Sequence, residues 1–225
     1  MTDDSAGGPD WSSALADDGP GLRGRVARAD WRRWLGGHLL LAVALFFAAA
    51  VAGWELLDAF SLEQLRALGE QFGPGTAPDE ELLPELTTLT IFLNNARVAF
   101  IAALGTVTGG LTAVFVLLVN GFVVGAVVNA GAKATSLVGV LALVVPHGVL
   151  ELPAFWVVSA VAFRVTHRFG RYLWGADDRP LTRQEAFEAV VVFVSMVALL
   201  AVAAAVEVHV TPLVGEAVGV ESALG

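Results

Sequence analysis

Pro146-His147-Gly148-Val149-Leu150-Glu151 is a short polar stretch between two strongly apolar segments. Residues 137–145 before it and residues 152–163 after it carry no charged side chain. A proline and a glycine flank the histidine, and both residue types loosen a helix. His147 and Glu151 are four residues apart, so they share one face of a helix that resumes at His147. Ionisable groups inside a membrane are costly and indicate a functional site by default, whereas near the bilayer surface they can simply be solvated, so the depth of this stretch decides its meaning.

The composition places the chain in a membrane. Of its 225 residues, 56% are hydrophobic and 16% are charged, and the mean hydropathy is +0.70. An average water-soluble domain is less apolar, so we expect a polytopic membrane protein. The absence of cysteine excludes disulfides and thiolate metal sites. The net charge of −9 argues against nucleic acid as a partner, and acidic segments with Lys133 as the single lysine suit a high-salt, halophile-like environment.

Apolar runs predict an all-α fold with about five transmembrane helices. The expected spans are residues 35–54, 94–119, 120–145, 146–166 and 185–206. Each run is about long enough for a hydrocarbon layer of about 30 Å at 1.5 Å per helical residue. Thr182 and Glu185 fit a capping box at the start of the last span. By the positive-inside rule, the basic loop 167–184 and the N-terminus are cytoplasmic, and the tail 207–225 lies outside the cell membrane.

The segments before the first span have their own composition. Residues 1–21 are rich in Asp, Gly and Ser and have no apolar period, so we expect a disordered acidic tail. Residues 22–34 are basic and contain tryptophans, as in the flank of a span or a segment lying on anionic lipid. A twin arginine at 32–33 leaves a second interpretation open, in which residues 35–54 belong to an export signal.

Residues 55–93 form one sizeable acidic loop that we expect outside the membrane. Ser61 and Gln64 fit a capping box that opens a short amphipathic helix. The apolar side of that helix would carry Leu62, Leu65, Leu68 and Phe72. Two interpretations remain: the loop is a solvated lid, or it is a docking surface for an unidentified protein partner.

The third span is interrupted by polar residues. Asn120-Gly121 opens it, and Asn129 and Lys133 follow within the same run. The pattern is compatible with one kinked span over 121–145, or with two re-entrant half-helices that face each other. Both arrangements indicate a polar interior, because a broken helix at membrane depth needs protein or water to satisfy its backbone. In the preceding span, Gly105, Gly109 and Gly110 predict close helix packing.

Three motifs follow one another in a specific order and spacing. They are Asn94-Asn95, Asn120-Gly121 with Gly125, and Pro146-His147-Gly148 with Glu151-Leu152. In these motifs the chain resembles the integral membrane family of stage II sporulation protein M, over roughly residues 91–171. The resemblance implies a multi-span helical protein, and the founding members hold cell-wall hydrolases at the septal membrane during engulfment. Sporulation itself is not implied, since many relatives sit in organisms that never sporulate.

The polar residues of the second and fourth spans are expected to meet. Charge assignment puts His147 and Glu151 near the outer end of one span and Asn94, Asn95 and Arg97 at the outer start of the other. We expect an Arg97–Glu151 ion pair with the histidine and an asparagine hydrogen-bonded beside it, pinning the two helices together. The predicted polar core and motif residues are Asn94, Asn95, Arg97, Asn120, Gly121, Gly125, Asn129, Pro146, His147, Gly148 and Glu151.

Three functions are compatible with this pattern. The main hypothesis is a non-enzymatic membrane scaffold, in contact with lipid, that recruits partner proteins. The second is an oligomeric channel or transporter for an ion or small solute, in which a homo-oligomer builds the pore. The third is an intramembrane metal-dependent hydrolase, but a zinc site needs about three protein ligands and the sequence supplies only His147 and Glu151. We therefore predict no catalytic residue, metal or cofactor.

Overall fold

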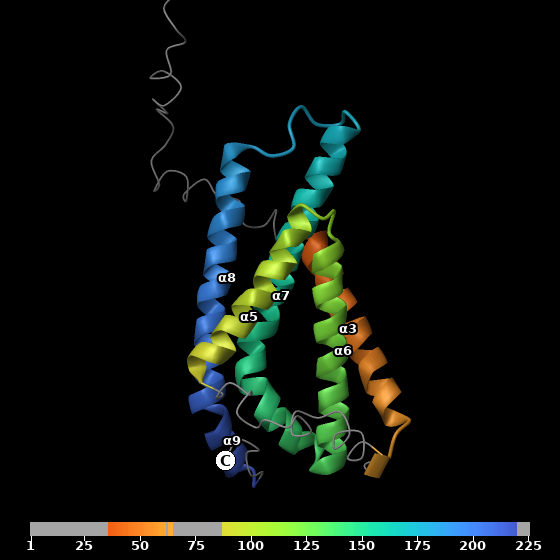
Figure 1. Ribbon diagram of the computed structural model, residues 1–225, viewed down its shortest axis with the longest axis vertical. Coiled ribbons are helices and arrows are strands. Elements are labelled where there is room, and N and C mark those ends of the chain that lie inside the picture. The colour runs from red at the N-terminus through yellow and green to blue at the C-terminus, as the bar shows by residue number, and fades with distance from the viewer. Residues whose placement is uncertain (1–35, 62, 65–86, 220–225) are drawn as a thin grey trace, which may run out of the picture. The chain divides into compact units, whose positions relative to one another are not determined.

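A computed structural model of the chain describes residues 36–61, 63, 64 and 87–219. The predicted acidic tail (1–21) and basic segment (22–34) lie outside these residues. The described elements are all helical, and five of them are long and apolar enough to cross a membrane. These helices are α3 (Gly37–Asp58), α5 (Thr88–Ala103), α6 (Leu111–Ala134), α7 (Leu137–Leu173) and α8 (Arg183–His209) (Figure 1). The prediction of an all-α fold with five spans is confirmed.

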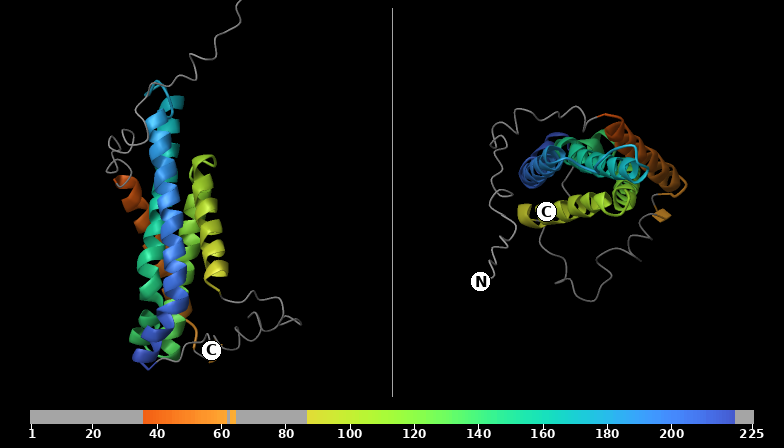
Figure 2. Two further views of the ribbon diagram at one scale, coloured as in Figure 1. Left: turned by 90° about the vertical axis from the view of Figure 1, so that its left-hand side faces the viewer. Right: turned by 90° about the horizontal axis from the view of Figure 1, so that it is seen from above.

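Helix α7 is the central element. It packs against α3, α5, α6 and α8, and against α9 (Thr211–Ala217), the short helix after α8 (Figure 2). Its 37 residues correspond to about 55 Å, well beyond the hydrocarbon thickness. Ser136 caps its first turn, since the Gly139 backbone N–H donates to Ser136 Oγ at 3.0 Å. The predicted span 146–166 is therefore only the middle of α7, and Pro146 lies inside the helix.

The second and third spans divide at a different point from the predicted one. Helix α5 ends in a 3-10 turn, η4 (Leu104–Thr106), and Gly109 and Gly110 connect it to α6 with φ values of 64° and 88°. This left-handed backbone favours glycine, so the glycine pair forms a turn instead of the expected packing surface. Only Gly105 packs as expected, because a Cβ there would lie 2.9 Å from the Ala113 and Ala162 Cβ atoms.

Helix α6 runs through Asn120-Gly121 without a break, so the predicted broken or re-entrant third segment is not found within residues 111–173. Asn120 Nδ2 donates to the Val116 carbonyl oxygen at 2.8 Å, which satisfies the amide inside the helix. A Cβ on Gly121 or Gly125 would overlap a backbone carbonyl of α3. These two glycines therefore let α3 and α6 approach closely, as small residues do in membranes. The chain reverses only at residues 135–136.

Asn129 and Lys133, the other expected interruptions, bind the C-terminal end of α3. Lys133 Nζ donates to the carbonyl oxygens of Leu57, Asp58 and Phe60 at 2.8, 3.2 and 2.9 Å. Asn129 Nδ2 donates to Asp58 Oδ1 at 3.3 Å. The last carbonyl groups of a helix have no intrahelical hydrogen-bond donor, and here the chain's single lysine donates to them.

Other helix ends also differ from the predicted ones. Helix α3 extends to Asp58 and α5 begins at Thr88, so the connection predicted as 55–93 is shorter. The predicted basic loop 167–184 is partly helical, because α7 continues to Leu173, and helices α8 and α9 occupy much of the predicted tail 207–225. The Thr182–Glu185 capping box is confirmed.

The capping box predicted at the start of the acidic loop is also present. The Ser61 backbone N–H donates to Gln64 Oε1 at 2.8 Å, and the Gln64 N–H donates to Ser61 Oγ at 3.2 Å. The rest of the expected amphipathic helix lies outside the described residues, and with it all four residues of its apolar side, Leu62, Leu65, Leu68 and Phe72.

Candidate functional site

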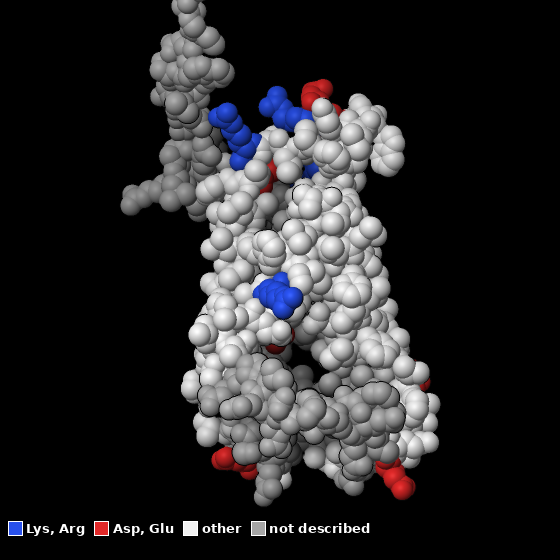
Figure 3. All heavy atoms as spheres, in the orientation of Figure 1, with Lys and Arg blue, Asp and Glu red and all other residues white. Residues whose placement is uncertain are grey.

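A cavity of about 490 Å³ lies between α5, α6, α7 and α8. It appears as a hollow in the molecular surface between α5 and α6 (Figure 3). Its apolar lining is mostly valine, including Val123 and Val124 of α6. Its polar lining consists of Thr90, Asn94, Asn95, Asn120, His147, Glu151 and Glu207. The cavity is thus a polar site within the spanning helices.

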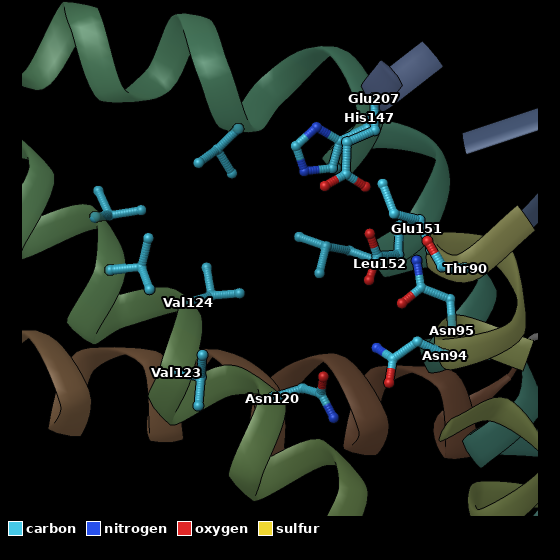
Figure 4. A pocket seen from close by; sticks show the side chains of 15 residues that line it. Thr90, Asn94, Asn95, Asn120, Val123, Val124, His147, Glu151, Leu152 and Glu207 are labelled. Atoms are coloured by element: carbon cyan, nitrogen blue, oxygen red, sulfur yellow. The ribbon is translucent and has the colours of Figure 1, made fainter. Parts of the chain in front are cut away.

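Three side chains that can ligate metals meet at one end of this cavity (Figure 4). His147 and Glu151 lie one helical turn apart on α7, and Glu207 approaches them from α8. One ring nitrogen of His147 and one oxygen of each carboxylate all lie within 4.8 Å of one another. We call these three residues the His–Glu cluster.

The histidine of the His–Glu cluster has a buried neighbour on α9. His147 Nδ1 lies 3.4 Å from Thr211 Oγ1. The Thr211 side chain is 5% exposed, and its hydroxyl donates to the Val206 carbonyl oxygen at 3.4 Å. Because that hydroxyl hydrogen points to Val206, the oxygen is left to accept from Nδ1–H. This arrangement favours the tautomer in which Nε2 keeps its lone pair.

Among the described residues, the cluster's two carboxylates have no lysine or arginine partner. The ion pairs among the described residues join Lys133 to Asp58, and three arginines at the other end of α7 to Asp177 and Glu185. In the part of the chain that the structure describes, no Lys or Arg lies within ion-pair distance of Glu151 or Glu207. Two carboxylates this close cannot both remain charged without a cation, so a carboxylate or the His147 imidazole must hold a proton, or the group must bind an ion.

Most of the predicted polar residues gather at this cavity. Asn94, Asn95 and Asn120 line it together with His147, Gly148 and Glu151. Gly121, Gly125 and Asn129 instead hold α3 against α6, as described above. Asn95 is 7% exposed, which places its amide within the bundle.

The predicted Arg97–Glu151 ion pair is wrong. Arg97 is exposed, and no described carboxylate lies within ion-pair distance of it. It follows Asn95 by two residues, which is about 200° around a helix, so it points away from the face that carries this asparagine. Arg97 lies 9 residues after Thr88 and 9 residues before Thr106, so it is midway along the span.

The comparisons with known proteins match most of the chain. The family model of stage II sporulation protein M matches residues 42–212. The chain belongs to this family. It is also 29% identical to an uncharacterized protein of Methanocaldococcus jannaschii over 124 residues, which are 55% of this chain and 70% of that protein. No solved structure matches the chain.

The stage II sporulation protein M match extends well beyond residues 91–171, the part in which the sequence motifs occur. It begins in α3 and ends at the start of α9, so it includes every residue that lines the cavity. The His–Glu cluster and Thr211 therefore belong to the family-matched part of the chain.

The sequence analysis missed Glu207 and Thr211. Charge counting assigned Glu207 to an outer tail, but α8 continues to His209 and turns this carboxylate toward α7. The signal that could have found it is the apolar character of the residues beyond: Val208, Val210, Leu213 and Val214 continue the hydrophobic run. A lone carboxylate inside such a run indicates an intramembrane polar site.

Proposed function

We propose that this stage II sporulation protein M family member is a non-enzymatic scaffold that binds a partner protein within the bilayer. One observation carries the proposal: Arg97 is exposed about midway along α5. Its neighbours on the same face, Leu93 and Phe100, are 55% and 57% exposed. The face is thus an apolar surface of a spanning helix with one positive charge at its centre.

That charge needs a counterion in the membrane. An arginine at the centre of a spanning helix costs about 2.5–3.5 kcal/mol on insertion scales. A carboxylate on a partner helix at the same depth would offset this cost, and Leu93 and Phe100 would pack on either side of the ion pair.

The charge pattern favours a different protein over a second copy as the partner. The exposed carboxylates of the described residues all lie at helix ends or in connections: Glu55, Asp58, Glu63, Asp178 and Glu216. A second copy therefore has no described, exposed carboxylate at the depth of Arg97. A partner with an Asp or Glu inside its own spanning helix fits this surface.

Site-specific photo-crosslinking in native membranes tests the scaffold proposal. A crosslinking residue at Leu93 is expected to form an adduct with a different protein. A matched probe at Val194, which is 58% exposed on α8, is expected to label lipid only. The adduct should be lost in Arg97→Leu and largely retained in Arg97→Lys, because the lysine keeps the charge. Adducts with lipid or with a second copy alone would contradict the proposal.

Orientation is part of the same proposal. Five of the six described arginines lie near the α7–α8 connection, and basic side chains gather at this end of the molecule (Figure 3): Arg164, Arg168 and Arg171 in α7, Arg179 in the connection, and Arg183 at the start of α8. By the positive-inside rule this end faces the cytoplasm, and the His–Glu cluster lies toward the outer face. The chain has no cysteine, so labelling of cysteines introduced at the exposed Arg179 and Glu216, from each side of the membrane, tests the assignment.

The cavity favours a second candidate function, a channel or transporter. Polar and ionisable groups at membrane depth line ion and solute paths in other proteins. In this chain the path would run through the hollow between α5 and α6, past Asn120 and Glu151. Flux of an ion or solute into liposomes that is abolished by Glu151→Gln would support transport, whereas wild-type vesicles that pass nothing would contradict it.

A further inference from the structure

We propose that His147, Glu151 and Glu207 bind one divalent transition-metal ion, of the zinc or manganese class, within the spanning bundle. The three ligand atoms lie within 4.8 Å of one another. Ligands of a tetrahedral zinc ion lie about 2.0–2.2 Å from the metal, so they lie roughly 3.5 Å from one another. Side-chain rotations alone can close that difference, since the ligands are long side chains on packed helices.

The donor set decides the class of ion. One imidazole nitrogen and two carboxylate oxygens suit borderline divalent ions such as zinc and manganese. Calcium and magnesium prefer an all-oxygen shell, usually with more ligands. Three protein ligands also leave a coordination position open toward the cavity, where the Asn94 and Asn95 amides lie (Figure 4).

A neighbour outside the ligand set supports the same assignment. Ligand histidines almost always use their second ring nitrogen to hydrogen-bond a protein group, which fixes the ring and its tautomer. Thr211 Oγ1, 3.4 Å from His147 Nδ1, is placed for this role, and its own hydrogen bond to the Val206 carbonyl orients the hydroxyl. Nε2 is then the nitrogen with a free lone pair for the ion.

Charge balance is an independent argument. With a neutral imidazole, Glu151 and Glu207 carry two negative charges, and no basic side chain among the described residues lies within ion-pair distance of either. A shared proton would neutralise only one of them. A divalent cation neutralises both at once, which favours its binding in a site of low dielectric.

Metal titration of the purified full-length chain in lipid nanodiscs tests the inference. After chelation and buffer exchange, zinc and manganese are expected to bind at one ion per chain, more tightly than magnesium or calcium. Glu151→Gln and Glu207→Gln should each weaken binding by more than tenfold. Thr211→Val should weaken it by about tenfold, the size of effect seen for partners of ligand histidines. Glu216→Gln, an exposed carboxylate on α9, is the matched control and should bind as wild type.

Thermal unfolding provides a second measurement and a test of folding. Zinc should raise the unfolding temperature of the wild type and of Glu216→Gln, but not that of Glu207→Gln, because the ion links α7 to α8. The metal-free unfolding temperature shows whether each variant folds. Absence of binding to the wild type, or binding that Glu151→Gln and Glu207→Gln leave unchanged, would overturn the inference. Tighter binding of sodium, calcium or magnesium than of zinc and manganese would also overturn it.

Discussion

Helices α7 and α8 share a polar cluster at each end, and the two clusters differ in how their charges are balanced. At one end Arg168 lies 2.8 Å from Asp177 and 3.6 Å from Glu185, Arg164 lies 3.6 Å from Glu185, and Arg171 lies 2.9 Å from Asp177. We call these five residues the arginine cluster. Toward the other end, the His–Glu cluster has two carboxylates and no arginine or lysine within ion-pair distance among the described residues.

Under the metal-site proposal, the difference separates a structural role from a binding role. The arginine cluster contains its own counterions, so it holds the α7–α8 connection in place without any outside group. The His–Glu cluster is electrostatically incomplete, and it adjoins a cavity of about 490 Å³. Polar groups that balance one another stabilise a fold, whereas an unbalanced set beside a cavity is arranged for something that binds there.

The largest expected effect comes from breaking the balanced cluster. Arg168→Met removes one of the two arginines that face Glu185, which is only 4% exposed, and leaves Asp177 with Arg171 alone. Of the two arginines, Glu185 then keeps only Arg164, at 3.6 Å, and the 2.8 Å hydrogen bond from Arg168 to Asp177 is lost. Because a hydrogen bond to a charged group contributes about 1.5–3 kcal/mol, we expect the free energy of unfolding to fall by about 2 kcal/mol. Reversible unfolding in mixed micelles measures it. Arg179→Met, an exposed arginine in the same connection, should change it by less than about 0.5 kcal/mol. Equal losses in the two variants would mean that the cluster is not a structural clamp.

The same type of change at the His–Glu cluster should have the opposite sign. In the metal-free protein, Glu207→Gln removes one of two neighbouring carboxylates that cannot both be charged, and it keeps the side-chain shape. The free energy of unfolding should therefore stay constant or rise by up to about 1 kcal/mol. Chemical unfolding in the presence of a chelator measures this. A loss as large as that of Arg168→Met would show that Glu207 already has a cationic partner, and the contrast between the clusters would disappear.

Much of this fold follows from hydrophobic runs. Length, composition and the run lengths predict five spans, because each spanning helix must bury its own backbone hydrogen bonds. The positions of the helix breaks cannot be predicted from these runs, because a glycine that forms a turn looks the same in the sequence as a glycine that packs against a neighbouring span. Gly109 and Gly110 form the α5–α6 turn in an uncharged run, whereas Asn120 looks like a break and satisfies its amide on the preceding helical turn.

About half of the site could be predicted from the sequence. The four-residue spacing of His147 and Glu151, with Asn94 and Asn95 at the matching end of another span, predicts that these groups meet. Glu207 could not be placed from the sequence. A carboxylate at the end of a hydrophobic run can face water or the helix bundle, and the outcome depends on where α8 ends and how α9 turns. Arg97 was paired with Glu151 because charges in membranes pair, but sequence position does not show which helix face meets which neighbour.

The smallest expected effect is a pH dependence of the arginine cluster. Hydrogen bonds from Arg171 lower the pKa of the Asp177 carboxyl below its usual value. A group whose pKa is depressed in the folded protein contributes stability above its unfolded pKa, about 3.9 for aspartate, and loses it as the pH falls through the folded value. Unfolding measured between pH 5 and pH 3 should therefore show a decline below about pH 4 that is shallower in Asp177→Asn. If the two proteins show the same acid slope, the Arg171–Asp177 contact is too well solvated to contribute to stability. The contacts of Arg164 and Arg168 with Glu185 would then be the part of the cluster that holds α7 and α8 together.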